Sequence, residues 1–223
     1  MARKPASHSG QDNASDAHRP RRKKKTGAPT FIERERRRQI LDIAARLFAE
    51  QGFDKTSLEA SAQEAGISRG VIFYYFEGKR DLGEQTVRRG LRDYSRYVRE
   101  RVAACNPGID QLFEFIDACL DYQREHREIY LLYIDLIGCF GDAEDKYALT
   151  VSMNRRTREW LVDIIEAGQD SGEIGPVPTQ ELADVIQGFV DGLMEMCALE
   201  PDGIDVDGCK TLIRTMISKT VTQ

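Results

Sequence analysis

Histidine is scarce in this chain, and the common catalytic motifs are missing with it. Only three histidines occur among 223 residues, and two of them, His8 and His18, lie in a polar segment near the N-terminus. The sequence has neither a glycine-rich phosphate-binding loop nor two histidines at the spacing of a metalloprotease. These absences predict that the protein is not an enzyme, and they indicate no cofactor and no metal site.

Cysteine is present but is not arranged for cross-linking or for binding zinc. The number of cysteines is odd, and no two of them are separated by only two residues. This pattern argues against a disulfide framework and against a zinc finger. We interpret the cysteines as free thiols. A regulator that senses oxidants through a reactive thiol stays open as an alternative. The cysteines are Cys105, Cys119, Cys139, Cys197 and Cys209.

Long apolar runs are also absent. No stretch approaches the roughly 20 apolar residues that a membrane-spanning helix requires. Residues 1–11 are polar and contain no apolar segment of the kind that forms the middle of a secretion signal. We therefore expect a cytoplasmic protein that has no membrane partner.

The net charge of −5 is distributed unevenly along the chain. Residues 1–29 carry eight basic and two acidic residues, residues 30–82 are neutral overall, and residues 83–223 carry 15 basic and 26 acidic residues. A positive end on an acidic body is typical of a protein that presents one end to a polyanion. Residues 1–29 have no apolar period, so we predict a disordered basic arm with its densest run at Arg19–Lys25. Attraction to phosphate and a solvated tail without function both stay open for this arm.

The apolar residues that follow the arm recur at helical spacing. They predict a first helix from Thr30 to Gly52, where glycine ends it. Two short helices, Leu58–Glu64 and Arg69–Phe76, then flank a tight turn at Gly66. This spacing predicts a helix-turn-helix, whose second helix lies in the major groove of DNA. The buried face of the first helix is expected to hold Ile40, Ile43, Ala44, Leu47 and Phe48.

The helical pattern continues to the C-terminus with no run that favours a strand. A long helix is expected over Lys79–Ala103, and glycine or proline separates the helices that follow it. The fold class is therefore predicted to be all-α. The further helices are expected at Ile109–His126, Arg127–Phe140, Asp142–Ser171, Thr179–Glu200 and Asp207–Val221.

Four segments in this order, Ala44–Thr56, Ala65–Gly70, Phe73–Phe76 and Lys79–Leu82, closely resemble the TetR family of regulators. The resemblance implies a helix-turn-helix DNA-binding domain of three helices at residues 30–82. It also implies a larger C-terminal helical domain, residues 83–223, that binds a small molecule and forms a homodimer. Members are usually repressors that hold a palindromic operator on double-stranded DNA until the effector releases them. A DNA-binding protein without an effector stays open as an alternative.

The resemblance and the helix pattern together mark residues that would contact DNA. Arg69 is expected to pair with guanine, and Phe73 replaces a family tyrosine whose hydroxyl contacts phosphate. Val71, Ile72 and Phe76 are interpreted as core residues of the same helix. Surface roles without DNA contact stay open for the arginine and the two tyrosines. The candidates are Thr56, Ser57, Ser68, Arg69, Gly70, Phe73, Tyr74, Tyr75 and Lys79.

The C-terminal domain has an apolar segment around Tyr130 that is expected either to border an effector cavity or to form ordinary core. Asp135 lies among these apolar residues, so it is expected to meet a cationic or polar ligand or a buried arginine. Residues from Thr157 to Leu193 loosely resemble the BetI-like branch of the family, without identifying a ligand. The candidate cavity residues are Phe115, Cys119, Tyr122, Tyr130, Tyr133, Asp135, Met153 and Trp160.

The last two predicted helices have apolar stripes that suit a subunit interface. Gly188 and Gly192 are four residues apart, where two helix backbones can approach closely. Two such helices from each subunit would form a four-helix interface. A core within one chain is the alternative. The candidate interface residues are Leu182, Val185, Ile186, Phe189, Leu193, Leu212 and Met216.

Overall fold

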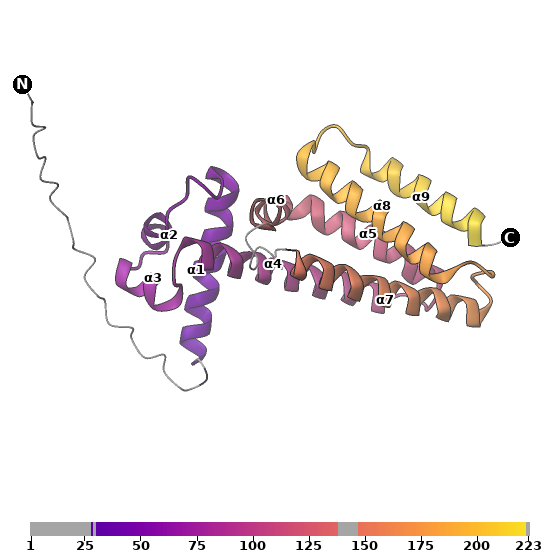
Figure 1. Cartoon of the computed structure of the whole chain (residues 1–223), viewed down its shortest axis with the longest axis horizontal. Helices are drawn as coiled ribbons and strands as arrows, with labels where there is room; N and C mark the ends of the chain where they lie inside the picture. The colour runs from indigo at the N-terminus through magenta and orange to yellow at the C-terminus, as the bar shows by residue number, and fades with distance from the viewer. Residues whose placement is uncertain (1–27, 29, 138–146, 222–223) are drawn as a thin grey trace, which may run out of the picture.

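The structure, a computed structural model, describes residue 28 and residues 30–137 and 147–221. Within these residues the chain forms nine helices and no strand, which confirms the all-α prediction (Figure 1). The helices are α1 Phe31–Gln51, α2 Leu58–Glu64, α3 Arg69–Tyr75, α4 Lys79–Ala103, α5 Ile109–Glu125, α6 Arg127–Leu136, α7 Ala148–Ser171, α8 Thr179–Leu199 and α9 Val206–Val221. The described residues exclude almost all of the predicted arm. They also exclude Cys139, the expected end of one helix at Phe140 and the expected start of the next at Asp142.

Both ends of α1 follow from local sequence signals. The Glu33 backbone N–H donates to the Thr30 hydroxyl at 3.2 Å, and the Glu33 carboxylate accepts from the Thr30 backbone N–H at 2.8 Å. This reciprocal capping box satisfies donors that the first turn leaves free. The helix ends at Gly52, where φ is 81°, a conformation that glycine adopts without steric cost.

The predicted helix-turn-helix is present as α2, a tight turn and α3. The turn needs a left-handed residue, which Gly66 supplies with φ of 62°. The Ile67 N–H then donates to the Ala62 carbonyl at 3.0 Å and closes the turn. Helix α3 ends at Tyr75, one residue earlier than expected, because Phe76 has an extended backbone that places its ring in the core.

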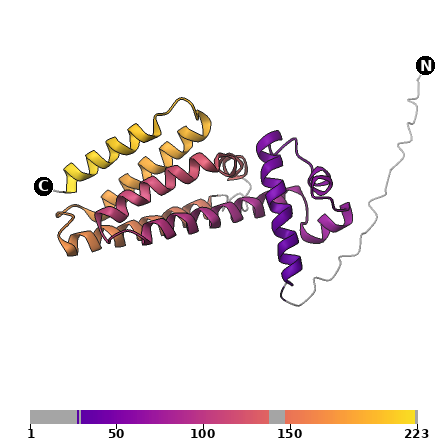
Figure 2. The same ribbon diagram turned by 180° about the vertical axis from the view of Figure 1, so that it is seen from behind.

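Two hydrophobic clusters divide the molecule into a head and a body (Figures 1 and 2). The head cluster joins α1, α2 and α3 to the start of α4 through Leu82 and Val87. The same head cluster includes Leu132 and Leu136 of α6. Helices α4 and α6 therefore connect the two parts, and the boundary at residues 82 and 83 stays a prediction.

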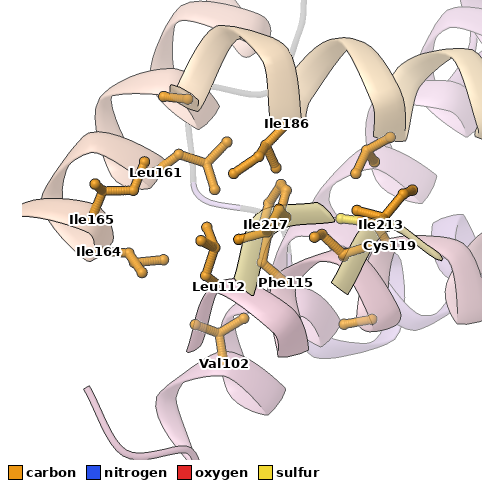
Figure 3. Close-up of a cluster of buried hydrophobic side chains, with 14 of the residues drawn as sticks. Val102, Leu112, Phe115, Cys119, Leu161, Ile164, Ile165, Ile186, Ile213 and Ile217 are labelled. Atoms are coloured by element: carbon orange, nitrogen blue, oxygen red, sulfur yellow. The ribbon is translucent and has the colours of Figure 1, made fainter. Parts of the chain in front are cut away.

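The body is built around α5, which packs against α4, α7, α8 and α9. Figure 3 shows side chains of α5, α7, α8 and α9 meeting in this cluster. None of the described helices has the length and apolar character needed to cross a membrane. The residues at the centre of the cluster include Leu112, Phe115, Cys119, Leu161, Ile165, Ile186, Ile213 and Ile217.

Candidate DNA interface and effector cavity

Helix α3 lies at the outer edge of the head, on the side away from the body (Figure 2). Ser68, Arg69, Gly70, Phe73 and Tyr74 are all exposed there. Ile72 is buried, as expected, but Val71 from the same helix is exposed. The prediction that Val71 belongs to the core is therefore wrong, because its position on α3 faces solvent. The exposed residues of α3 therefore include most of those expected to contact DNA.

Arg69 is held by contacts that are themselves at the surface. Its guanidinium forms an ion pair with Glu59 at 3.1 Å and lies over the ring of Phe73, 5.6 Å from the centroid. Exposed ion pairs of this kind contribute little stability, so they do not oppose a move toward a base edge. Phe73 cannot donate to phosphate, but its ring supports the arginine that is expected to read bases.

Tyr74 connects the recognition helix to the start of α1. Its hydroxyl donates to the Glu33 carboxylate at 2.8 Å, and its ring meets the Tyr75 ring edge-on at 5.0 Å. Glu33 is also the residue that completes the α1 capping box. The first turn of α1 is therefore fixed beside the exposed face of α3.

Two residues expected to contact DNA, Thr56 and Ser57, form hydrogen bonds within the protein. Thr56 is only 1% exposed, and its hydroxyl donates to the Leu47 carbonyl at 3.2 Å and to the Gly52 carbonyl at 2.9 Å. The expected DNA contact of this side chain is corrected, because Thr56 closes the connection between α1 and α2. Its neighbour Ser57 is exposed and caps α2 through the Ala60 N–H.

The ammonium of Lys79 is likewise engaged with the protein. It donates to the carbonyls of Phe53 and Asp54 at 3.1 and 3.0 Å, and it lies 4.7 Å from the centroid of the Phe53 ring. These contacts hold the connection between α1 and α2 against the start of α4. These two hydrogen bonds use two of the three N–H groups of the ammonium, so a phosphate contact by Lys79 does not require it to leave either carbonyl.

A cavity of about 430 Å³ lies among α4, α5, α6, α7 and α8. It brings together five of the expected cavity residues and adds further polar ones from α5 and α8. Volumes of this size suit small organic ligands. The expected residues that line it are Phe115, Tyr122, Tyr130, Tyr133 and Met153.

Three expected cavity residues do not line this space. Cys119 is fully buried in the body core, where it accepts a hydrogen bond from the Tyr94 hydroxyl at 3.0 Å. Trp160 packs edge-on against Phe115 at 5.6 Å. Asp135 is exposed on α6, so the expectation that it meets a ligand or a buried arginine is wrong. Asp135 does not line the cavity because it lies on the outer side of α6.

The acidic residue that does face the cavity is Asp191 on α8, accompanied by Glu195 one turn later. Asp191 accepts two hydrogen bonds from the Gln187 side chain, at 3.1 and 3.0 Å. Burial raises the pKa of its carboxyl, and these hydrogen bonds oppose that change. The i, i+4 spacing of Asp191 and Glu195 was a signal that could have found them, but we interpreted this helix by its apolar stripe alone, as a subunit interface or a core within one chain.

A second hollow, of about 710 Å³, is a charged cleft lined by residues of α1 and α4 together with a few from α5 and α6. Arg89 crosses it and pairs with Asp42 at 2.7 Å and with Asp93 at 3.6 Å. These ion pairs engage the Arg89 guanidinium within the protein. The smaller space, which contains five of the expected cavity residues, is the candidate effector cavity.

Cys105, Cys119 and Cys197 do not have the properties of sensor thiols. Burial raises the pKa of Cys119 to about 12, and it also raises the pKa values of Cys105 and Cys197. Reactive thiols have depressed pKa values, because the thiolate is the reacting form. The redox alternative loses support from these three residues, while Cys139 lies outside the described residues.

Helices α8 and α9 present an apolar face that nothing in the described chain covers. Val185, Phe189, Leu212 and Met216 are exposed on it, and Leu182 and Leu193 are half-buried at its margin. Gly188 and Gly192 are exposed beside them, with open space where a side chain would begin. Ile186 is 1% exposed in the core of its own chain, so its expected place at a subunit interface is corrected.

Comparison with known proteins identifies both parts of the chain. Residues 40–86 match the family model of bacterial regulatory proteins of the tetR family, and residues 108–222 match the C-terminal model of BetI-type transcriptional repressors. The chain belongs to the TetR family of transcriptional regulators. The helix-turn-helix of α2 and α3 is therefore the DNA-binding element of a TetR-family regulator.

Three similar proteins cover between 66% and 89% of this TetR-family chain. The regulator BetI of Vibrio atlanticus is 26% identical over 203 residues, which cover 89% of this chain and 96% of the relative. The repressor KstR2 of Rhodococcus jostii is 29% identical over 66% of this chain and 72% of its own length. A putative regulator from Saccharomonospora viridis, solved in complex with choline, has the same fold. Its TM-score is 0.70 and its identity 21%, over 85% of this chain and 99% of the other.

Proposed function

We propose that this TetR-family chain is a homodimeric repressor that holds a palindromic operator and releases it when a compact organic cation fills the body cavity. The observation that carries the proposal is the position of α6. Tyr130 and Tyr133 of this helix line the cavity, while Leu132 and Leu136 belong to the core of the head. A ligand that displaces α6 therefore acts on both parts of the molecule.

The contact between α4 and α6 supports this coupling. Gly90 of α4 lies so close to Ile129 of α6 that a side chain at Gly90 would collide with it. Both residues line the cavity. Because packed helices shift as units rather than deform continuously, a ligand that moves α6 would also change how α4 holds the head.

The walls of the cavity favour a cationic ligand. Tyr94, Tyr122, Tyr130 and Tyr133 present aromatic surface, and Asp191 supplies a carboxylate. Burial raises the pKa of Tyr122 and of Tyr130 to about 12, so their phenols stay neutral. Aromatic rings and a carboxylate together attract a quaternary ammonium group. The structural relative from S. viridis was solved in complex with choline, which supports a ligand of this class.

The uncovered face of α8 and α9 supports a dimer. Exposed apolar side chains that form one face are a signature of association. A twofold-symmetric dimer would place two recognition helices about 34 Å apart or at a multiple of this spacing, which matches a palindromic site. Effector-independent binding is the less favoured alternative, because the body contains a ligand-sized cavity.

The experiment is a DNA-binding titration with matched ligands. An operator obtained by binding-site selection is labelled, and its anisotropy with the protein is followed as choline is added. We expect release by choline, and release only at much higher concentration by 3,3-dimethylbutan-1-ol, which has the same shape without the charge. Operator binding that stays unchanged at saturating choline and at saturating concentrations of other organic cations would contradict the proposed effector.

Two aspartate variants test the place of the ligand. Asp191→Asn removes the carboxylate at the cavity, so more choline should be required for release. Asp135→Asn removes an aspartate of the neighbouring helix α6 that is exposed outside the cavity, and it should leave the choline requirement unchanged. Equal responses of the two variants would argue against the assigned cavity.

A further inference from the structure

Helix α3, at the outer edge of the head (Figure 2), exposes three large apolar or aromatic side chains although it has only seven residues. They are Val71, Phe73 and Tyr74. Elsewhere in the described part of the head, only Phe31 and Ile32 are large apolar residues with exposed side chains. Apolar side chains that are exposed singly are ordinary, whereas several on one short element indicate a surface that meets a partner.

Val71 differs from the two aromatic residues on this surface. The Phe73 ring lies beneath the Arg69 guanidinium, and the Tyr74 hydroxyl donates to Glu33, so contacts within the protein explain part of both side chains. The Val71 side chain contains only carbon, so it forms neither an ion pair nor a hydrogen bond, and it is 39% exposed. A β-branched residue also has a low helix propensity. Neither the core nor the helix therefore explains a valine at this position.

Gly70, the residue before Val71, leaves space beside the valine. A side chain that began at Gly70 would meet the Ser68 hydroxyl oxygen at 3.9 Å, which is an ordinary contact distance. Glycine within a helix is less stable than alanine, because it loses more conformational freedom on folding. The fold has room for a side chain at Gly70, so the space there is available to a partner.

Tyr74 lies one helical turn beyond Gly70 and Val71. Residues three and four positions apart share one face of a helix, and helical side chains lean toward the start of the helix. The Tyr74 ring is therefore directed toward the turn that holds Gly70 and Val71. The hydrogen bond of its hydroxyl to Glu33, at 2.8 Å, holds the ring in place. These three residues, Gly70, Val71 and Tyr74, form what we call the α3 notch, with the glycine backbone as its floor.

DNA presents one apolar group that suits this notch. Helix α3 belongs to the helix-turn-helix of a TetR-family regulator, and its partner is the major groove. The base edges in that groove carry hydrogen-bond donors and acceptors, and the 5-methyl group of thymine is their apolar group. We propose that the α3 notch binds the methyl group of a thymine in the operator, and that Val71 sets the base preference at that position. The inference rests on DNA binding by α3 and is independent of the proposed effector.

Replacing thymine by uracil in the DNA tests the notch directly. Uracil keeps the hydrogen-bonding groups of thymine and lacks the methyl group. The full-length protein is titrated by anisotropy with operators, obtained by binding-site selection, in which one thymine at a time is replaced by deoxyuridine. We expect affinity to fall about fourfold at one thymine, and at its symmetry mate in a palindromic operator, because one buried methyl contact is lost. Unchanged affinity at every position, or a selected operator without thymine, would overturn the proposal.

A valine variant assigns the methyl contact to its residue. Val71→Ala removes two methyl groups from an exposed position and should fold normally, because alanine favours a helix. It should bind the thymine and uracil operators with equal affinity. Val151→Ala, which changes a 59% exposed valine of α7 in the body, is the matched control and should keep the fourfold preference for thymine. A preference for thymine that survives in Val71→Ala would show that another group reads the methyl, and would overturn the role of Val71.

A glycine variant separates the notch from the stability of the helix. Gly70→Ala should leave the melting temperature of the free protein unchanged or higher, because the added methyl group meets no close atom. It should also abolish the preference for thymine over uracil, because the floor of the notch is filled. A lower melting temperature would show that Gly70 serves the fold, and a persisting preference would place the methyl group elsewhere. Either result would overturn the α3 notch as the site of methyl recognition.

Discussion

At the scale of single residues, position along a helix decides which polar side chains are available to a partner. Asp135 and Asp191 both lie in helices rich in apolar residues, and the sequence favoured the first as a ligand contact. The structure places Asp135 outside the cavity and Asp191 in its wall. The periodicity of a helix shows which residues share a face, but the neighbours of that face depend on tertiary packing. This information is not contained in the local pattern.

Recognition of the DNA sequence by the head should depend on Arg69 more than on any other residue. Arg69→Ala removes the only arginine of α3, so we expect specific operator binding to weaken by roughly 1–3 kcal/mol and the preferred sequence to become less defined. Binding-site selection with both proteins measures this change. Arg155→Ala, an exposed arginine of α7 in the body, serves as the control. An unchanged selected sequence for Arg69→Ala would count against base reading by this residue.

Thr56 should affect stability more than DNA contact. Thr56→Val keeps the shape and leaves two carbonyls, those of Leu47 and Gly52, without their donor. We expect the free energy of unfolding to fall by about 1–3 kcal/mol, as measured by urea denaturation. Thr56→Ser keeps the hydroxyl, so its free energy of unfolding should fall less than that of Thr56→Val. If Thr56→Val instead has normal stability and weak operator binding, the hydroxyl contacts DNA after all.

At the scale of helices, the residues at which a helix begins and ends could be predicted from the sequence, but the helices that it packs against could not. The ends of α2 and α4 matched the sequence prediction, and at α2 the Ser57 cap and the turn glycine Gly66 act within a few residues. The pairing of α6 with both the head core and the cavity joins residues far apart in sequence. No local signal marks such an arrangement, so the sequence assigned α6 to the ligand domain alone.

The apolar face of α8 and α9 leads to a prediction about assembly. Leu212 is 60% exposed in the single chain, whereas the adjacent Ile213 is 5% exposed. Leu212→Glu places a charge on the proposed interface, so we expect a folded monomer by light scattering and circular dichroism. Ile213→Ala creates a cavity in the core and should cost about 2–5 kcal/mol of stability while the dimer persists. A Leu212→Glu protein that remains dimeric would place the subunit interface elsewhere.

At the scale of the whole molecule, the uneven charge could be predicted from the sequence, but the cavity could not. The counts of basic and acidic residues already separate a positive arm from an acidic body. The cavity exists because five helices leave space between them, and it depends on contacts such as that between Gly90 and Ile129. Such space is a property of packing, so composition and periodicity cannot indicate it.

The basic arm yields a prediction at this scale, because α1 begins near the recognition surface. Thr30 caps α1, Glu33 follows in the first turn, and Tyr74 of α3 donates to Glu33. The chain therefore enters the head beside α3, and residues 1–29 are attached close to the DNA that α3 would bind. Each phosphate contact by a basic side chain adds about 0.9 to the slope of log affinity against log salt concentration.

Deleting residues 1–29 while keeping Thr30 should lower that slope, with operator affinity most reduced at low salt. Anisotropy titrations over a series of salt concentrations measure the change. A full-length variant with neutral residues in place of the basic side chains of Arg19–Lys25 separates the effect of charge from that of chain length. Because the capping box and the Tyr74 contact remain in both proteins, their folded heads should be equally stable. Identical slopes for the wild-type and both altered proteins would show that the arm makes no phosphate contacts.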